Sequence, residues 1–412
     1  MAEALRIDAR RLAADLDALS RIGRVEGGGL DRRAFGDGDR AGRAWLAQRI
    51  RDAGFAVHVD GAANLGTCLP GSTDLPCVMT GSHIDTVPGA GQLDGALGVL
   101  CGLEALRTLA ERGPGLARTV ELVAFSDEEG RFGGMLGSQA MSGQLTPDAI
   151  ERARDLDGTT LVDAMAAAGH RAHDALGAER EAGSIHAYVE LHIEQGPVLE
   201  RTGHAIGVVD AITGLFRWDV RLLGETNHAG TTPMDMRRDA FQGLAEVAAQ
   251  IDRVLEENGG PRSRATVGRV DLVPGAANVI PGEARFALEV RDTDAHSLSE
   301  LSTAFRRAFS AVARRRDLRF EYEVVSELAP VACDARVVDA ARAACAALGT
   351  EPLAMPSGAA HDAQMIARIA PAGMIFVPSR AGRSHSPAEW TSPADIELGA
   401  NVLLHALVEL AR

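Results

Sequence analysis

The sequence of 412 residues lacks lysine altogether, and all 42 of its basic residues are arginine. This absence excludes mechanisms that need a lysine, such as Schiff-base catalysis, phosphate binding by a Walker A motif and the Ser-Lys dyad. We attribute the absence to a GC-rich coding bias that favours arginine codons. The exclusion of these chemistries holds whatever its origin.

Cysteine is also scarce, and the five residues are scattered with no Cys-x-x-Cys pair: Cys68, Cys77, Cys101, Cys333 and Cys345. An odd, dispersed set suggests neither a disulfide framework nor a thiolate zinc site, so we expect a reducing compartment. The first 19 residues carry four carboxylates, unlike a signal peptide, and no apolar run reaches the length of a membrane span. We therefore expect a cytoplasmic protein with no membrane partner.

Positive charge is in short supply, because 57 acidic residues outnumber the 42 arginines and leave a net charge of −15. This balance opposes binding to phosphate backbones, so we expect no nucleic-acid partner. The apolar share of 46% and the charged share of 24% are those of an ordinary globular protein. The length allows two domains.

Strands and helices alternate along the first half of the chain. Periodicity predicts helices at 4–19, 40–53 and 95–112, and strands at 55–59, 76–80, 119–126, 188–193 and 205–212. This alternation predicts an α/β domain whose ligands bind at the carboxyl ends of the strands. The stretch 144–184 is helical and polar, and its pattern indicates no role.

The pattern changes after residue 213 and returns near residue 335. In the intervening stretch the order is strand, helix, strand, strand, helix, strand. The strands are predicted at 216–223, 265–271, 285–291 and 318–325, and the helices at 239–257 and 297–315. This order is typical of an α+β sandwich. The α/β pattern then resumes with a helix at 335–348, a strand at 374–377 and a helix at 396–410. We therefore predict a domain of residues 213–329 inserted between the two parts of the α/β domain, 1–212 and 330–412.

Histidines and carboxylates stand at or just after the predicted strands and in glycine-rich loops of the α/β domain: His83, Asp85, Asp94, Glu128, Glu129, His192 and His385. A rigid scaffold presents side chains at such positions to a crevice. Imidazole and carboxylate ligands without thiolate suit zinc, manganese, cobalt or nickel. Two ions could be held if one carboxylate bridges them.

These residues lie in the strings GSHIDTVPGAGQLDG, FSDEEGRFGG, ELHIEQGPVLE and GRSHSPAEW. With NHAGTTPMDMRRDA, VPGAANVIPGEARFALEVRDTD and SGAAHDAQMI, they follow the order and spacing of the M20 group of metal-dependent amidohydrolases. Over nearly its whole length the chain resembles the branch of N-carbamoyl-L-amino acid hydrolases, allantoate amidohydrolases and β-ureidopropionases. The resemblance implies a binuclear-metal, aminopeptidase-like α/β domain, a central sheet flanked by helices, with an inserted α+β sandwich that serves as dimerisation and lid domain.

The resemblance also implies two divalent metal ions in each subunit. Their ligands would be His83, Asp94 and His192 for one ion, and Asp94, Glu129 and His385 for the other. Asp94 would bridge the ions. Asp85 would fix the orientation of the His83 imidazole, as carboxylates commonly do beside metal ligands. Glu128 would act as the general base.

The inserted domain would complete the site. By the same resemblance, His228 reaches from the partner subunit of a homodimer to polarise the scissile carbonyl. Asn278 and Arg291 would clamp the substrate carboxylate, which the planar guanidinium of arginine can grip through two hydrogen bonds. Gln195 and the backbone of Ala360 are further candidates for substrate binding.

Two departures from the family pattern are visible. The family commonly reads EEGSRF where residues 128–132 read EEGRF, and it commonly has glycine where Ala360 stands. Both bear on the loop after Glu129 and on the room around the substrate, and neither removes a metal ligand.

The predicted activity is therefore hydrolysis of the carbamoyl C–N bond of an N-carbamoyl-L-amino acid, which yields the amino acid, carbon dioxide and ammonia. Within the family the alternatives are an allantoate or ureidoglycolate-type amidohydrolase, and then an aminoacylase or peptidase. Outside it, a non-catalytic metal-binding protein and a phosphate-directed two-metal enzyme stay open. The complete ligand set argues against the first, and the absence of lysine with the charge of −15 argues against the second.

Overall fold

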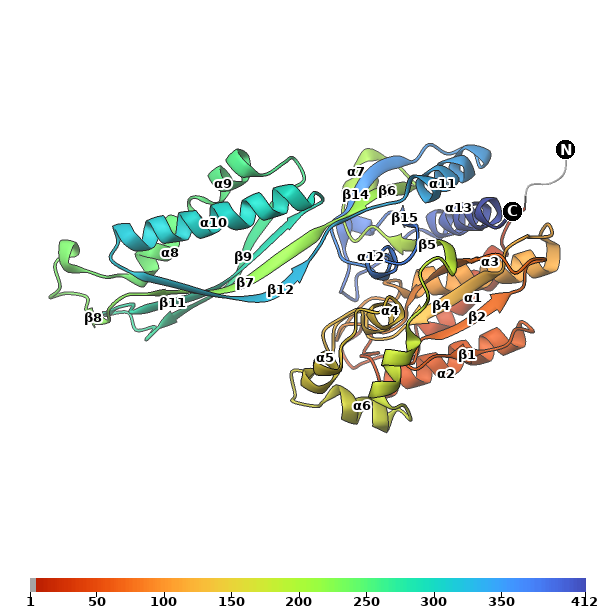
Figure 1. Cartoon of the computed structure of the whole chain (residues 1–412), viewed down its shortest axis with the longest axis horizontal. Coiled ribbons are helices and arrows are strands. Elements are labelled where there is room, and N and C mark those ends of the chain that lie inside the picture. Colours follow the sequence, from red (N-terminus) through yellow and green to blue (C-terminus); the bar gives the residue numbers. More distant parts are fainter. Residues whose placement is uncertain (1–4) are drawn as a thin grey trace. The chain divides into compact units, whose positions relative to one another are not determined.

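The computed structural model describes residues 5–412. They fall into two units, one formed by the chain up to Asp210 and from Cys333 onward, the other by Ala211–Ala332 (Figure 1). The sequence had placed the inserted segment at 213–329. Within residues 5–412, no helix combines the length and the apolar character that a membrane crossing requires.

The larger sheet, formed mainly by strands of the first unit, is mixed, and its described strands run in the order β1-β2-β4-β3-β5-β15-β6-β13, with β14 paired to β6. The four central neighbours β4, β3, β5 and β15 are parallel, and the pairs toward both edges are antiparallel. The strands are β1 (His58–Val59), β2 (Leu65–Leu69), β3 (Cys77–His83), β4 (Val120–Phe125), β5 (Ile185–Ile193), β6 (Gly207–Ile212), β13 (Val331–Ala332), β14 (Leu353–Ser357) and β15 (Ala372–Val377).

Helices cover both faces of this sheet (Figure 1). Val189 and Leu191 of β5 face the main apolar core, which α3 and α13 share. Side chains alternate along a strand, so Glu190 points the other way, where the N–H of Ala363 in α12 donates to it. The helical elements are α1 (Ala9–Leu19), α2 (Asp37–Asp52), α3 (Ala96–Arg112), α4 (Leu136–Met141), α5 (Pro147–Arg152), α6 (Leu161–Ala167), η1 (Ala172–Ala178), α7 (Val198–Thr202), α11 (Ala335–Ala347), α12 (Asp362–Ile366), η3 (Arg380–Gly382) and α13 (Pro393–Ala411).

The first helix begins later than the apolar pattern predicts. Residue 4 lies outside the described residues, and α1 starts only at Ala9 because the carboxylate of Asp8 accepts the backbone N–H groups of Arg10 and Arg11. A side chain that satisfies these groups sets the start of a helix more firmly than apolar spacing does.

The second unit consists of a four-stranded antiparallel sheet, ordered β12-β7-β11-β9, and a separate two-stranded ribbon, β8 with β10. Its core packs α8, α9 and α10 against one face of the sheet, around Trp218, Phe286 and Phe309. The elements are β7 (Gly214–Leu223), β8 (Asn227–His228), η2 (Met234–Met236), α8 (Ala240–Ala248), α9 (Ile251–Asn258), β9 (Arg264–Val273), β10 (Val279–Ile280), β11 (Glu283–Asp292), α10 (Ala295–Arg315) and β12 (Arg319–Leu328).

The single helix predicted for 239–257 is two helices, α8 and α9. The side-chain amide of Gln250 donates to the carbonyl of Glu246, and its backbone N–H bonds to Val247 three residues back. In a regular α-helix the backbone N–H of Gln250 would bond to the carbonyl of Glu246, which here accepts the side-chain amide instead. The regular hydrogen-bond ladder is interrupted between Ala248 and Ile251.

Candidate metal centre

Four of the predicted metal ligands come from neighbouring parallel strands. His83 ends β3 and His192 lies near the end of β5. Glu129 follows β4, and His385 lies in the loop after β15. Carboxyl ends of parallel strands meet at one edge of a sheet, so the order β4-β3-β5-β15 brings these side chains together.

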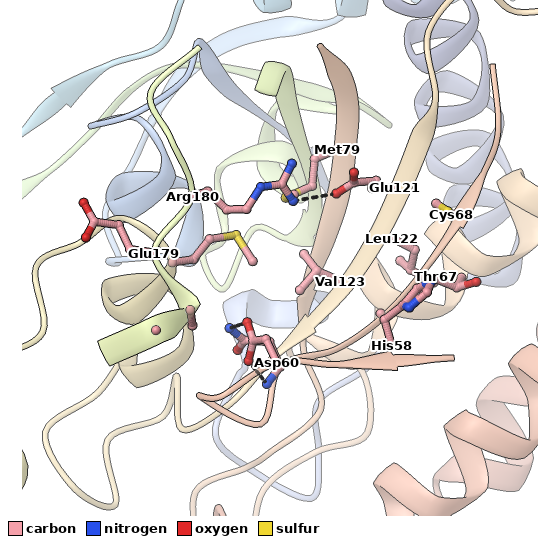
Figure 2. A pocket seen from close by; sticks show the side chains of 15 residues that line it. His58, Asp60, Thr67, Cys68, Met79, Glu121, Leu122, Val123, Glu179 and Arg180 are labelled. Atoms are coloured by element: carbon pink, nitrogen blue, oxygen red, sulfur yellow. Dashed lines mark hydrogen bonds and ion pairs between the residues drawn. The ribbon is translucent and has the colours of Figure 1, made fainter. Parts of the chain in front are cut away.

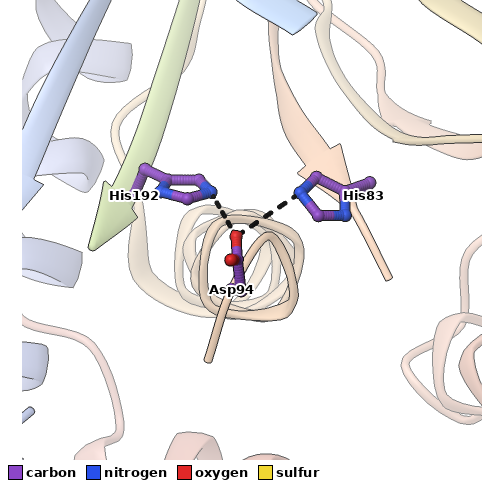
Figure 3. A group of neighbouring side chains, drawn as sticks. All are labelled: His83, Asp94 and His192. Carbon is purple, nitrogen blue, oxygen red and sulfur yellow. Dashed lines mark ion pairs between the residues drawn. The ribbon is translucent and has the colours of Figure 1, made fainter. Parts of the chain in front are cut away.

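Asp94 supplies the carboxylate around which these side chains gather. Its Oδ1 lies 3.1 Å from Nε2 of His192 and 3.7 Å from Nε2 of His83 (Figure 3). One donor atom from each of these three buried residues lies within 4.8 Å of the others, close enough to hold one metal ion.

The other oxygen of Asp94 faces a second group. Oδ2 lies 3.2 Å from Nε2 of His385, and the same imidazole nitrogen lies 3.4 Å from Oε2 of Glu129. Asp94, Glu129 and His385 also place one donor atom each within 4.8 Å. The two oxygens of one carboxylate are thus divided between two groups, which is the arrangement of a bridging ligand.

The backbone around the centre is unusual in two ways. Gly95 has a φ of +61°, and a Cβ there would lie 2.4 Å from the imidazole of His83, so only glycine allows this approach. Three further residues, Asp127, Gln195 and His385, have φ values of 50°, 57° and 50°. Residues other than glycine rarely adopt this backbone region. Such conformations often gather at functional sites.

The charges around Asp94 shift the pKa of its neighbours in the ion-free protein. Burial opposes ionisation of Asp94, but hydrogen bonds to His192 and His385 hold its pKa well below the usual value. Burial lowers the pKa of His192, and the hydrogen bond to Asp94 outweighs this and raises it to about 9. The hydrogen bond to Asp94 likewise raises the pKa of His385 to about 9. Burial and the charge of Asp94 raise the pKa of Glu129 to about 8.

The orientation of His83 is set by a backbone carbonyl. Its Nδ1 lies 3.0 Å from the carbonyl oxygen of Asp85, whereas the carboxylate oxygen of Asp85 lies 3.7 Å away, beyond hydrogen-bond distance. The Asp85 carboxylate instead accepts the backbone N–H groups of Glu128 and Glu129 at 3.4 and 3.1 Å. Asp85 therefore holds the segment that carries the two glutamates, a contact that differs from the predicted one. Burial lowers the pKa of His83 to about 4, so this imidazole is neutral at pH 7.

Glu128 lies beside the first donor group, with its Oε2 3.5 Å from Nε2 of His83. Burial first, and then the carboxylates of Asp362 and Glu129, raise its pKa well above the ordinary value. A carboxyl group with a raised pKa holds a proton more readily than an ordinary one, which suits Glu128 to proton transfer beside these donor groups.

The structure adds buried side chains that sequence reasoning missed. Glu190, His192 and His361 form a third group with donor atoms within 4.8 Å. Both oxygens of Glu190 are already engaged, by the hydroxyl of Ser82, the hydroxyl of Tyr188 and the N–H of Ala363. A fully engaged carboxylate is best explained as a structural support.

Signals for some of these residues were present in the sequence. His361 and Asp362 stand in SGAAHDAQMI, and Glu389 stands in GRSHSPAEW. The ring centroids of His361 and His192 lie 4.6 Å apart, so His361 packs beside a predicted ligand. Glu190 stands two residues before the predicted ligand His192, on the strand itself.

Gln195 contacts the centre directly. Its side-chain amide donates to Oδ2 of Asp94 at 2.8 Å and to the hydroxyl of Ser384 at 3.1 Å. Its backbone N–H donates to the hydroxyl of Ser379 at 3.0 Å. In this structure the amide is engaged by the carboxylate of Asp94, and its predicted contact with substrate stays a prediction.

The three site residues predicted in the second unit lie on different strands or loops of that unit. His228 on β8 pairs with Val279 on β10, and the carbonyl of Asn278 accepts the N–H of Ala229. His228 and Asn278 therefore share one ribbon. Nδ1 of His228 accepts the N–H groups of Gly230 and Thr231, so the neutral imidazole carries its proton on the exposed Nε2.

Arg291 lies near the end of β11, where its partner on β7 is Leu215. Its Nε donates to the carboxylate of Glu289 on the same strand at 2.8 Å, and Glu289 also pairs with Arg217. Arg291 thus takes part in an ion pair on its own strand in this structure, and its predicted contact with the substrate carboxylate stays a prediction.

A hollow of about 390 Å³ lies elsewhere in the first unit, between the sheet and the segment 177–180 (Figure 2). Met79 and Glu121 face it, and Glu121 pairs with Arg180 at 3.0 Å. None of the residues that line it belongs to a donor group of the metal centre. The candidate metal centre and this hollow are therefore formed by different residues of the first unit.

Comparison with known proteins decides the family. A profile of the peptidase family M20/M25/M40 matches residues 79–409. An N-carbamoyl-L-amino acid amidohydrolase of Geobacillus stearothermophilus is 41% identical over 410 residues, which cover 98% of this chain and 99% of that protein. The chain belongs to the peptidase family M20/M25/M40.

Two further M20 relatives bear on the branch and on the fold. Allantoate amidohydrolase of Escherichia coli (strain K12) is 36% identical, covering 95% of this chain and 96% of that protein. The crystal structure of an amidase of the hydantoinase/carbamoylase family from Burkholderia multivorans superposes with a TM-score of 0.91, at 36% identity and 99% coverage of both chains. The predicted M20 resemblance and the predicted fold are confirmed. The M20 family is metal-dependent, and the described residues bring clustered potential ligands together.

Proposed function

We propose that this M20 protein hydrolyses the carbamoyl C–N bond of N-carbamoyl-L-amino acids. One water is consumed, and the products are the L-amino acid, carbon dioxide and ammonia. Relatives named for this activity are up to 41% identical over almost the full length. The structural observation that carries the proposal is the carboxylate of Asp94, which divides its two oxygens between two groups of metal donors.

The donor set fits two divalent ions. His83, Asp94 and His192 would hold one ion, and Asp94, Glu129 and His385 the other. Imidazole nitrogens with carboxylate oxygens and no thiolate suit zinc, manganese, cobalt or nickel. Bound ions of this kind polarise a carbonyl and lower the pKa of water.

Glu128 would carry the proton. Its raised pKa and its position 3.5 Å from His83 suit a carboxylate that takes a proton from the attacking water and delivers it to the leaving nitrogen. No serine, cysteine or lysine nucleophile is needed, because water is the nucleophile.

The second unit would bind and polarise the substrate. His228 is exposed, and its Nε2–H would donate to the oxygen on which charge develops. Arg291 would grip the carboxylate of the amino acid, together with Asn278. We further propose a homodimer in which the ribbon of the partner subunit completes each site.

The protein would act in the cytoplasm. The five cysteines are free thiols in the structure, and this agrees with a reducing compartment.

A second candidate substrate is allantoate, which the Escherichia coli relative takes by its name. The ligands and the proton carrier would be the same, and only the pocket around the substrate would differ. Ala360, where the family commonly has glycine, precedes His361 in the chain and is one position at which the pocket would differ.

The test is a substrate screen with defined metals. The ion-free protein is reconstituted separately with Mn²⁺, Co²⁺, Ni²⁺ and Zn²⁺, and ammonia release is measured with N-carbamoyl amino acids and allantoate. Product formation from N-acetyl amino acids is measured in parallel. We expect the highest kcat/KM with an N-carbamoyl-L-amino acid. A preference for N-acetyl substrates or dipeptides would overturn the proposal.

A further inference from the structure

Glu389 is a buried carboxylate outside both donor groups, with 4% of its surface exposed. Its Oε1 accepts the backbone N–H of Leu93 at 2.7 Å and that of Asp94 at 3.1 Å. Two successive peptide groups are therefore held by one oxygen. These are the peptides that lead into α3 and carry the bridging carboxylate.

The other oxygen of Glu389 reaches the loop that carries His385. Oε2 lies 3.0 Å from the hydroxyl of Ser384, and that hydroxyl lies 2.9 Å from Oδ2 of Asp94. Glu389 thus connects the backbone of Asp94 with the residue that precedes His385. This connection therefore joins the backbone of Asp94 to the loop of His385, whose Nε2 lies 3.2 Å from Oδ2 of Asp94.

The fit around Glu389 is close. Gly91 lies against its side chain, and a Cβ at that position would lie 2.3 Å from both Cβ and Oε1 of Glu389. The chain on the other side is anchored as well, because the carbonyl of Trp390 accepts the N–H of Arg380, and the hydroxyl of Thr391 donates to the carbonyl of Pro378. A side chain packed this tightly has one conformation available.

From these contacts we infer that Glu389 is a positioning residue of the metal centre: by holding the peptides of Leu93 and Asp94 against the loop of His385, it sets where the bridging carboxylate stands between the two ions. The inference rests on the proposed metal centre. Groups that orient metal ligands commonly change metal affinity or activity by roughly 10- to 100-fold when they are removed.

Two substitutions at Glu389 distinguish the effect of side-chain length from the effect of negative charge. Glu389→Gln keeps the length and a carbonyl oxygen that can accept both N–H groups, but it removes the negative charge. Glu389→Asp keeps the charge, but it is shorter by one methylene and cannot span the same gap. Glu104→Gln serves as the matched control, because Glu104 is a buried carboxylate of α3 that accepts the N–H of Asp8 and pairs with Arg11 away from the centre.

The readouts are the binding of two Mn²⁺ or Zn²⁺ ions, measured by equilibrium dialysis and calorimetric titration, and the separate values of kcat and KM. We expect Glu389→Asp to weaken the binding of at least one ion by roughly 10- to 100-fold and to lower kcat more than it raises KM. Glu389→Gln should lie nearer the wild type, and Glu104→Gln should change thermal stability alone.

Two results would overturn the inference: wild-type metal affinity in Glu389→Asp, or a larger loss in Glu389→Gln than in Glu389→Asp, which would assign the effect to charge. The metal titrations do not depend on which substrate is turned over. If the wild-type protein binds two ions but hydrolyses no ureido compound, the proposed function is refuted. The metal titrations still test the role of Glu389 in that case.

Discussion

His228 and Arg291 lie at opposite ends of the second unit. The ribbon that carries His228 follows the end of the sheet where Glu283 pairs with Leu223, whereas Arg291 pairs with Leu215 at the other end. Eight residue steps along β11 separate positions 283 and 291, and they span about 26 Å at the usual rise of a strand. A substrate the size of a carbamoyl amino acid cannot contact both side chains within one unit, so a site that uses both requires two subunits.

Complementation between two inactive variants tests this arrangement. Activity is measured at substrate concentrations well below KM, where it follows kcat/KM. Under these conditions we expect His228→Ala and Arg291→Ala each to lose most activity, and a mixture of the two subunits, unfolded and refolded together, to regain about one quarter of the wild-type value. Half of randomly paired dimers are heterodimers, and each heterodimer has one complete site. Activity of the refolded mixture is measured against each variant refolded alone.

The matched control for this experiment combines His228→Ala with Asn278→Ala. These residues share one ribbon, so every mixed dimer lacks one of them in each site, and no activity should return. A site shared between subunits would be contradicted if activity returned in this control. It would also be contradicted if no activity returned when His228→Ala is mixed with Arg291→Ala.

Glu128→Gln isolates proton transfer. The substitution keeps the shape of the side chain and removes the carboxylate that takes the proton, so we expect kcat to fall by about 10²- to 10⁴-fold. Metal content and thermal stability should stay near the wild type. Glu121→Gln is the control, because Glu121 lies on β4 before the same loop and faces the hollow instead. Wild-type turnover in a metal-replete Glu128→Gln protein would remove Glu128 from the mechanism.

Arg291→Ala isolates carboxylate recognition. Loss of a charge-assisted hydrogen bond costs about 1.5–3 kcal/mol, so we expect KM to rise about tenfold or more with a smaller change in kcat. Arg217→Ala is the control, since Arg217 pairs with the same carboxylate of Glu289 from the neighbouring strand. An unchanged KM would assign Arg291 to the surface ion pair alone.

Metal binding should release protons at pH 7. In the ion-free protein His192 and His385 have a pKa of about 9 and Glu129 a pKa of about 8, so all three are largely protonated at pH 7. An ion must displace these protons, and its affinity should therefore increase as the pH rises from 6 toward 9. Calorimetric titrations in buffers with different ionisation enthalpies count the protons. Binding that weakens over this pH range would show that the donors are other groups.

The sequence by itself predicted much of the candidate site. The apolar runs that become β3, β4 and β5 are recognisable without a structure, and the histidines and carboxylates stand at or just after them. Because parallel strands align their carboxyl ends, this local order is enough to predict that His83, Glu129 and His192 approach one another. The M20 motifs pointed to the same residues, and the profile match confirmed the family.

The tertiary structure decided what depends on partners far apart in the chain. Glu389 acts on the peptides of Leu93 and Asp94, almost 300 residues earlier, and no local pattern reveals which backbone groups a buried carboxylate will accept. The same holds for the carbonyl of Asp85, which takes the role predicted for its carboxylate. Sequence patterns report which residues are buried and where elements begin, whereas hydrogen bonds between distant segments exist only once the chain has packed.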